Sequence, residues 1–423
     1  STHAASAAPP GFQSLYNGRD LSGWWGLGTE DPAKWQALSP DELARKKAAS
    51  LEDIRKHWRA EGDELVNDGD GLYLTTEKEF GDFELQLEYR TVAGADSGVY
   101  LRAIPQVQIW DTTKAGGKWG GDLGAEYGSG ALWNNTKGRP GKNPLALADK
   151  PFGQWNKFHI VMIGERVTIH LNDQLVVDHA RLENYFNRNA AVPARGPIQL
   201  QTHGGEIRWR NLFIREIGGD EARTRLRQQD RRAGFYPILT EATGTKGWAG
   251  PIDEYDFVGG VLRCKPGKGG TVFYKAEEYG DFTALLEFRL PPGGNNGLAI
   301  RYPGEGDTAY VGMCELQVLD DTAQKYATLD ARQYHGSAYG MVAARRGYQR
   351  PVGEWNYQRV TVRGSRIEVE LNGTLILDAD LATVKDYMAN SPHPGKERAK
   401  GYFGFAGHGD PVEFQQVEVR PER

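Results

Sequence analysis

An internal repeat with a period close to 200 residues constrains the fold of this chain more than any other feature. The segment Gly153-Gln154-Trp155-Asn156 recurs as Gly353-Glu354-Trp355-Asn356, and eight of the 24 positions from Trp155 to Asp178 match residues 355–378 without a gap. Further matches keep the same order along the chain, from 81–83 with 280–282 to His203-Gly204 with His408-Gly409. Because solenoid repeats are only 20–50 residues long, this period predicts two related domains.

The repeat also sets the expected domain boundaries. Gly218-Gly219 closes the first copy, and the residues from there to Arg232 are highly charged, which is typical of an exposed linker helix. We therefore expect one domain at 11–217, a charged linker at 218–234 and a second domain at 235–421. A chain of 423 residues is long enough for two separate hydrophobic cores.

The hydrophobic pattern within each copy has a period of two. Val167 to Leu171 alternates between apolar and polar residues, as does Ile367 to Leu371, and Asn372-Gly373 after the second run is a strong hairpin signal. Many short strands joined by glycine-rich turns are typical of a β-sandwich or jelly roll. The predicted fold is all-β, with two sandwich domains in tandem.

Residues 39–60 break this pattern and predict a helix. Ser39 is suited to the N-cap, Pro40 to the first helical position and Glu42 to a capping box. The second copy has no counterpart of this segment. It is therefore expected to be a helical insertion in the first domain, either beside a site or packed between the domains.

Composition narrows the classes of function. A net charge of -5 argues against a nucleic-acid-binding protein, and no apolar run reaches the length that spans a membrane. The chain begins with small residues and a Pro-Pro pair, which predicts a mature end after removal of a signal peptide, and hence a secreted or periplasmic protein; a trimmed end is the alternative. Cys264 and Cys314 are too few for a disulfide scaffold or a zinc site. Two buried free thiols are the favoured interpretation, and one disulfide is the other.

Strand alternation places polar side chains together on one face of each copy. Carboxylates, amides, guanidinium and imidazole groups recur at matched positions, and such groups suit a ligand rich in hydroxyls. Solvated sheet faces and cross-strand Glu–Arg pairs are the alternative, purely structural explanation. The polar positions with counterparts in both copies are Glu88, Arg90, Arg102, Gln108 and His203 in the first, and Glu287, Arg289, Arg301, Gln317 and His408 in the second.

Several ordered motifs resemble one known family. Leu15 to Trp24, Ser97 to Arg102, Gln108 to Asp111 and Glu315 to Asp320 are similar to segments of the 3-keto-disaccharide hydrolase domain family, and the resemblance covers nearly the whole chain. It implies concanavalin-like, laminin-G-like sandwiches, bacterial export and sugar substrates oxidised at C3. A C3 ketone acidifies the C2 proton, so a base can remove it and the C1 substituent can leave, after which water adds. A divalent metal ion is a possible cofactor that could chelate the ketone.

The resemblance also implies site residues in both domains. The catalytic candidates are Glu315, His408, Asp320 and Arg301. The substrate-binding candidates are Gln317, Tyr339, Glu287, Tyr100, Arg102, Gln106, Gln108, Asp111, Trp133, His203 and Glu88.

The two copies differ at the position of the candidate base. Gln106 stands where Glu315 stands, and an amide cannot act as a base, so the second domain is the better catalytic candidate, with Glu315 or His408 as base. The first domain keeps the more family-like Tyr100 where the second has Ala299. A non-catalytic, lectin-like carbohydrate-binding protein and a protein-interaction module are the rival interpretations.

Overall fold

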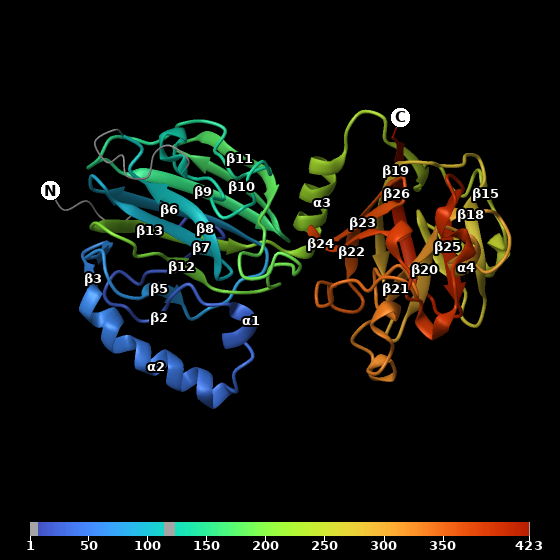
Figure 1. Cartoon of the computed structure of the whole chain (residues 1–423), viewed down its shortest axis with the longest axis horizontal. Helices are drawn as coiled ribbons and strands as arrows, with labels where there is room; N and C mark the ends of the chain where they lie inside the picture. Colours follow the sequence, from blue (N-terminus) through green and yellow to red (C-terminus); the bar gives the residue numbers. More distant parts are fainter. Residues whose placement is uncertain (1–6, 114–122, 423) are drawn as a thin grey trace. The chain divides into compact units, whose positions relative to one another are not determined.

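The computed structural model describes residues 7–113 and 123–422 and divides the chain into two compact units, Ser1–Gly218 and Gly219–Arg423. Each unit is a sandwich of two antiparallel sheets, one larger than the other (Figure 1). The two units are described separately below.

The larger sheet of the first unit has eight strands. These strands are β1 (Gln13–Ser14), β3 (Trp58–Glu61), β4 (Glu64–Asn67), β6 (Phe83–Thr91), β9 (Asn156–Ile163), β10 (Arg166–Leu171), β11 (Gln174–Arg181) and β13 (Ile207–Glu216). They lie in the order β11-β10-β9-β6-β13-β4-β3, with β1 beside β13.

The second sheet of this unit has five strands. These are β2 (Trp24–Leu27), β5 (Tyr73–Thr76), β7 (Asp96–Leu101), β8 (Ile104–Trp110) and β12 (Ile198–Leu200), in the order β2-β5-β12-β7-β8. Alternate residues of β6, such as Leu85 and Leu87, are fully buried and meet Val99 and Leu101 of β7 in one hydrophobic core. The period of two in the sequence therefore corresponds to an apolar face turned toward the opposite sheet.

The second unit repeats both sheets. Its larger sheet comprises β14 (Tyr236–Leu239), β16 (Tyr255–Val258), β17 (Val261–Cys264), β19 (Phe282–Arg289), β22 (Trp355–Arg363), β23 (Arg366–Leu371), β24 (Thr374–Asp380) and β26 (Glu413–Pro421). Its smaller sheet comprises β15 (Trp248–Ala249), β18 (Gly269–Tyr274), β20 (Asn295–Tyr302), β21 (Cys314–Leu319) and β25 (Tyr402–His408). Their orders, β16-β17-β26-β19-β22-β23-β24 with β14 beside β26, and β15-β18-β25-β20-β21, correspond strand for strand to the first unit.

In the described part of the chain, two helices are long and the others are short. They are α1 (Pro32–Trp35), α2 (Pro40–His57), α3 (Gly219–Asp230) and α4 (Thr308–Val311), with 3-10 turns η3 (Ala125–Tyr127), η4 (Ile252–Glu254), η5 (Gln324–Tyr326), η6 (Ala331–Gln333), η7 (Leu381–Thr383), η8 (Met388–Asn390) and η9 (Pro394–Glu397). No helix in the described part of the chain is long and apolar enough to cross a membrane.

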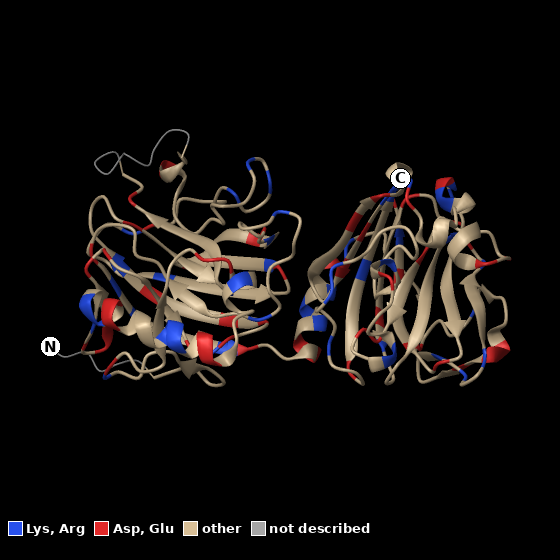
Figure 2. Cartoon of the chain, turned by 60° about the horizontal axis from the view of Figure 1, so that its bottom comes forward, with Lys and Arg blue, Asp and Glu red and all other residues tan. Residues whose placement is uncertain are grey.

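The predicted insertion helix is present as α2. Ser39 is its N-cap, with a side-chain oxygen that accepts a hydrogen bond from the Glu42 amide at 3.2 Å. It ends three residues before the predicted end, at His57, because Trp58 begins β3. Acidic residues lie in its first turn and basic residues in its last, which complements the helix dipole, and both charges are visible along it in Figure 2.

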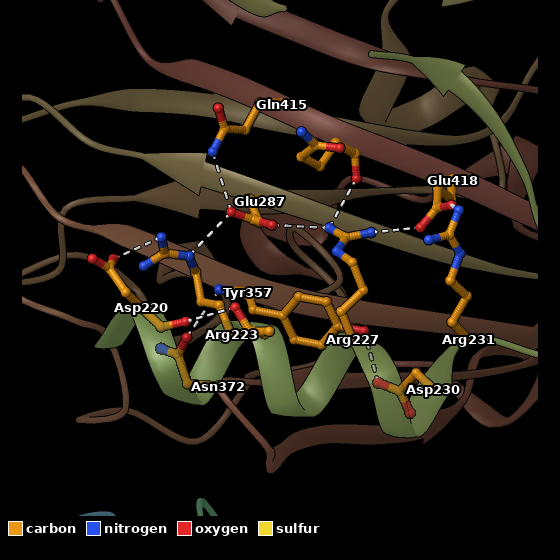
Figure 3. A network of polar contacts seen from close by, with 12 residues as sticks. Asp220, Arg223, Arg227, Asp230, Arg231, Glu287, Tyr357, Asn372, Gln415 and Glu418 are labelled. Carbon is orange, nitrogen blue, oxygen red and sulfur yellow. Dashed lines mark hydrogen bonds and ion pairs between the residues drawn. The ribbon is translucent and has the colours of Figure 1, made fainter. Parts of the chain in front are cut away.

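The charged segment at the start of the second unit is helical, but it is not an exposed linker. In α3, Ala222 and Leu226 are fully buried, and Arg223 and Arg227 bind the carboxylate of Glu287 at 3.1 Å each (Figure 3). The helix therefore belongs to the second unit and covers part of its larger sheet.

Both cysteines are buried free thiols, so the disulfide alternative is wrong. Burial raises the pKa of both Cys264 and Cys314. Neither thiol is a ready nucleophile, because the thiolate is the reactive form.

Candidate functional site

The smaller sheet of the second unit carries a carboxylate–imidazole pair on its outward face. Glu315 on β21 points across the neighbouring strand β20 toward His408 at the end of β25, and its carboxylate lies 3.1 Å from the His408 Nε2. The Glu315 side chain is 7% exposed, whereas the His408 side chain is 43% exposed. The imidazole is therefore open to a ligand, while the carboxylate is held behind it.

The contact with Glu315 decides the electrostatics of His408. The hydrogen bond that His408 donates to the Glu315 carboxylate raises the pKa of His408 and outweighs burial, which lowers it. When the carboxylate accepts from Nε2–H, the neutral imidazole has its lone pair on Nδ1. The pair thus fixes the tautomer and increases the basicity of Nδ1, as in other histidine–carboxylate pairs.

Gly297 makes room for the Glu315 side chain to reach His408. It lies on β20 between the two partners, and a Cβ atom there would be only 2.6 Å from Cγ and 2.7 Å from Cδ of Glu315. Any larger residue would displace the carboxylate from its path to His408.

Replacing Gly297 by alanine is expected to break the pair without unfolding the unit. The pKa of His408, measured by NMR titration, should fall toward its ordinary value because the hydrogen bond that raises it is lost. Gly280→Ala is the matched control, since its nearest atom would be 3.4 Å away, and it should leave the titration unchanged. An unaltered pKa in Gly297→Ala would contradict this role of the glycine.

A polar and aromatic rim surrounds the pair. The Gln317 amide donates to the Gln333 carbonyl at 2.9 Å, and the Gln333 amide donates to the Tyr339 hydroxyl at 3.2 Å. The Tyr339 backbone N–H donates to the Glu315 carbonyl at 2.9 Å. The predicted residues Glu315, His408, Gln317 and Tyr339 thus come from adjoining segments of one face.

Sequence reasoning missed Tyr310, which lies on α4 beside this rim. Burial is the main cause that raises the pKa of Tyr310, and the charge of the nearby Glu315 contributes. Its ring stacks on His393 at 4.5 Å between centroids. The signal was available, because residues 303–312 have no counterpart in the first copy, where β7 and β8 are joined directly.

Three predicted residues of the second unit do not lie at this site. The Arg301 side chain, 3% exposed, turns into the end of the sandwich and donates to the carbonyls of Gly280, Gly364 and Arg398. Its φ of 48° takes it out of strand alternation, which explains why the expected outward placement was wrong. Arg102 is its counterpart in the first unit, with a φ of 52° and the same kind of carbonyl contacts.

The aspartates predicted beside the site instead stabilise loops. Asp320 accepts hydrogen bonds from the Gly293 amide and from the amide and hydroxyl of Thr322. Asp111 makes the equivalent bonds to Gly94 and Thr113. Because their oxygens are already used in this way, neither aspartate reaches the polar face.

Glu287 and Glu88 belong to the larger sheets, so their predicted place at the site was wrong. Glu287 on β19 is bound by α3, and Glu88 on β6 accepts from Arg210 at 3.0 Å and from Asn211. The alternation pattern gave each residue the correct outward direction but not the correct sheet. Strand pairing depends on contacts far apart in sequence, which a periodic pattern does not contain.

The first unit has its own polar chain on the equivalent face. The Gln106 amide donates to Gln108 at 2.5 Å, and the Gln108 amide donates to Asp96 at 2.7 Å. The other oxygen of Asp96 lies 3.4 Å from the Nε2 of His203. Sequence reasoning missed Asp96, although the alternation that exposes Gly98 on β7 also turns Asp96 to the same face.

The two aromatic candidates of the first unit differ in access. Trp133 is half-buried, packs edge-on against Trp110 at 5.9 Å, and holds the position that corresponds to Tyr339. Tyr100 is 1% exposed, and its hydroxyl contacts the Thr29 hydroxyl at 2.6 Å. Its ring is therefore covered, and the expectation that it lies open to a ligand was wrong.

The residues present do not fit a divalent metal ion. In the described ranges, no group of three or more His, Cys, Asp and Glu side chains gathers closely enough to ligate one. The Glu315–His408 pair supplies one carboxylate and one imidazole, fewer than such sites use.

The fold and site define a class: tandem concanavalin-like sandwiches with a carboxylate–imidazole pair on the polar face of a sheet. Comparison with known families gives a match to the 3-keto-alpha-glucoside-1,2-lyase-like domain over residues 11–215 and 238–420. Since these two ranges make up most of the chain, the protein belongs to this family.

Individual relatives are more distant. A Bacteroides thetaiotaomicron protein named 3-keto-disaccharide hydrolase is 25% identical over 250 residues, covering 49% of this chain and 79% of the relative. A solved structure from Parabacteroides distasonis, provisionally named a glycosyl hydrolase, is 25% identical with a TM-score of 0.40, covering 44% of this chain and 99% of that one. The carbohydrate-binding module CBM66 of Bacillus subtilis is 16% identical with a TM-score of 0.25, covering 44% and 95%.

Proposed function

We propose that the second unit cleaves 3-keto-glycosides by removing the C2 proton and expelling the C1 substituent. The observation that carries this proposal is the exposed His408 imidazole, hydrogen-bonded at 3.1 Å to the buried Glu315 carboxylate. Membership of the family supports the substrate class. The reaction requires proton transfer from a carbon made acidic by an adjacent ketone, and a histidine of raised pKa is a suitable base.

The bonds change in two stages. His408 takes the proton from C2, and the electron pair of the C2–H bond forms an enolate with the C3 ketone. The enolate then re-forms the ketone as the C1=C2 double bond forms and the C1–O bond breaks, and the departing oxygen takes up a proton. Water added across C1=C2 gives the free 3-keto sugar, so the net reaction is hydrolysis.

A neutral phenol beside the pair suits the developing negative charge. Tyr310 has a pKa raised chiefly by burial, so it keeps its proton and can donate to an enolate or to the leaving oxygen. Tyr339 lies on the same rim. In this proposal Glu315 does not touch the substrate: it positions His408 and stabilises the imidazolium formed when His408 takes the proton.

The first test is turnover of a 3-keto-glucoside and of the same glucoside with an ordinary C3 hydroxyl, followed by chromatography. Cleavage of the keto substrate alone is expected, because only the ketone acidifies the C2 proton. Binding of the keto sugar without cleavage would replace this proposal by the lectin-like alternative.

The secreted or periplasmic location also stays a proposal, which fractionation of the source cells would test.

The pH profile gives a second expected result. In the chain with Asp96→Asn and His203→Asn, only the second unit retains a carboxylate–imidazole pair on its smaller sheet. The kcat/KM of this chain should rise with pH through a single midpoint above 6.5, the ordinary pKa of histidine. The rise follows because His408 acts as a base only when deprotonated, and its raised pKa moves this change to higher pH. Glu315→Gln should lower the midpoint. A midpoint that does not move would exclude this role of Glu315.

A further inference from the structure

We infer that the first unit holds a second 3-keto-sugar site, in which Asp96 supplies the carboxylate that Gln106 lacks. This inference rests on the proposed function of the second unit. It differs from the sequence interpretation, in which the Gln106 substitution left the first unit the weaker candidate. The two positions lie on the neighbouring strands β7 and β8 of the smaller sheet (Figure 1).

The strand register makes the two units directly comparable. Gly98 on β7 pairs with Gln108 on β8, as Gly297 on β20 pairs with Gln317 on β21. Asp96 therefore corresponds to Asn295, two residues before the glycine in each unit. Gln106 correspondingly takes the place of Glu315.

Each unit thus has one carboxylate and one amide at these two positions, with the identities exchanged. The first unit has Asp96 with Gln106, and the second has Asn295 with Glu315. Two carboxylates together would repel each other and shift one pKa upward, whereas two amides would leave the histidine without an anionic partner. The exchange keeps a single negative charge in both places.

The carboxylate meets the same imidazole nitrogen in both units. The Asp96 oxygen lies 3.4 Å from Nε2 of His203, and the Glu315 oxygen lies 3.1 Å from Nε2 of His408. Asp96 stands close to its histidine and needs only a short side chain. Glu315 lies one strand farther away, on β21, and reaches its histidine with a longer side chain that passes over Gly297 of β20.

In both units the carboxylate is more buried than the imidazole. Asp96 has a side-chain exposure of 10% and His203 of 51%, against 7% and 43% for Glu315 and His408. In each unit the imidazole is accessible from solvent and the carboxylate lies behind it. This is the arrangement in which the histidine contacts the ligand and the carboxylate positions the histidine.

A polar atom without a partner marks the place of the ligand. The side-chain oxygen of Gln201, a residue 5% exposed, meets no hydrogen-bond partner among the described residues. It lies with the Gln106 amide over Gly98, whose added Cβ would be 2.9 Å from one and 3.1 Å from the other. Because buried polar atoms are rarely left unpaired, this oxygen is suited to accept from a sugar hydroxyl.

The test uses the full chain in four forms. The second unit is disabled by Glu315→Gln with His408→Asn, the first by Asp96→Asn with His203→Asn, and the fourth form carries all four changes. Each is given a 3-keto-glucoside, and turnover is followed by chromatography. Each is also titrated calorimetrically with an unreactive analogue in which carbon replaces the glycosidic oxygen.

Two active sites predict a defined pattern. The form with a disabled second unit should keep turnover at least about tenfold above the fourth form, since general acid–base catalysis contributes about 10²- to 10⁴-fold. Restoring Asp96 alone in the fourth form should not raise turnover, whereas restoring Asp96 with His203 should raise it. All four forms should bind two analogues with similar affinity, because the polar groups around each pair remain in place, so the differences in turnover report the chemical step.

The outcomes separate the two proposals. If the wild-type chain cleaves no 3-keto-glucoside, the proposed function fails. If the wild-type chain cleaves it but the Glu315→Gln, His408→Asn form turns it over no faster than the fourth form, only the proposed site in the first unit is overturned. Unfolding is checked by thermal melting of each form; Asp96→Asn preserves size and His203 is half-exposed, so all four should melt in two comparable transitions.

Discussion

Replacing His408 by asparagine in the chain that already carries Asp96→Asn and His203→Asn is expected to lower kcat by about 10²- to 10⁴-fold. The loss follows because asparagine keeps a polar side chain of similar reach but has no titrating nitrogen to accept the C2 proton. KM should change far less than kcat, since the surrounding Gln317 and Tyr339 remain in place. The measurement is steady-state turnover of a 3-keto-glucoside.

A matched control separates this effect from the loss of any histidine–carboxylate pair. His179 on β11 lies 2.5 Å from Asp178 and is half-exposed, but it belongs to the larger sheet of the first unit. His179→Asn should leave turnover within about twofold of the parent, a change of less than about 0.5 kcal/mol. A fall in kcat of similar size in both variants would contradict the assignment of His408 as base.

Replacing Arg301 by alanine is expected to destabilise the second unit by about 3–5 kcal/mol, because several backbone carbonyls lose a buried charged donor at about 1–3 kcal/mol each. Its guanidinium joins the carbonyls of Gly280, Gly364 and Arg398, and it also binds Asp281 at 3.1 Å. Lysine should not rescue it, because an ammonium group lacks the planar fork that reaches several acceptors. Chemical denaturation followed by fluorescence measures the change in the free energy of unfolding.

Arg289→Ala provides the comparison for this prediction. Arg289 binds Glu413 at 2.9 Å, but its side chain is 36% exposed, so its removal should cost less than about 1 kcal/mol. If Arg301→Ala were as stable as Arg289→Ala and yet lost turnover, Arg301 would be a substrate-contacting residue after all. The same variant therefore distinguishes the structural role seen here from the catalytic role that the sequence suggested.

The parts of the fold that depend on local pattern could be predicted from the sequence. Strand alternation and the repeat predicted two sandwiches, and they placed Gln317 and Glu315 outward on one strand. The cap at Ser39 predicted the start of α2. In each case the determining interaction lies within a few residues along the chain, where periodicity and turn chemistry are informative.

The predictions were wrong where a backbone angle or a contact distant in sequence sets the position of a side chain. The positive φ of Arg301 rotates its side chain away from the face that alternation predicts. The sheet to which Glu287 belongs depends on pairing with β22 and β26, which lie far along the sequence. Asp96 has no identical counterpart in the second copy, because the negative charge is kept at a different position, so matching residues between the copies do not reveal it.

The central claim is that His408 removes the C2 proton. Turnover of a 3-keto-glucoside carrying deuterium at C2 tests it most directly, in the chain whose first unit is disabled by Asp96→Asn and His203→Asn. Slower cleavage of the deuterated substrate, together with exchange of the C2 hydrogen with solvent deuterium that disappears in His408→Asn, is the predicted result. Equal rates for both substrates, with no exchange at C2 in either protein, would show that the glycosidic bond breaks without proton abstraction and would contradict the account.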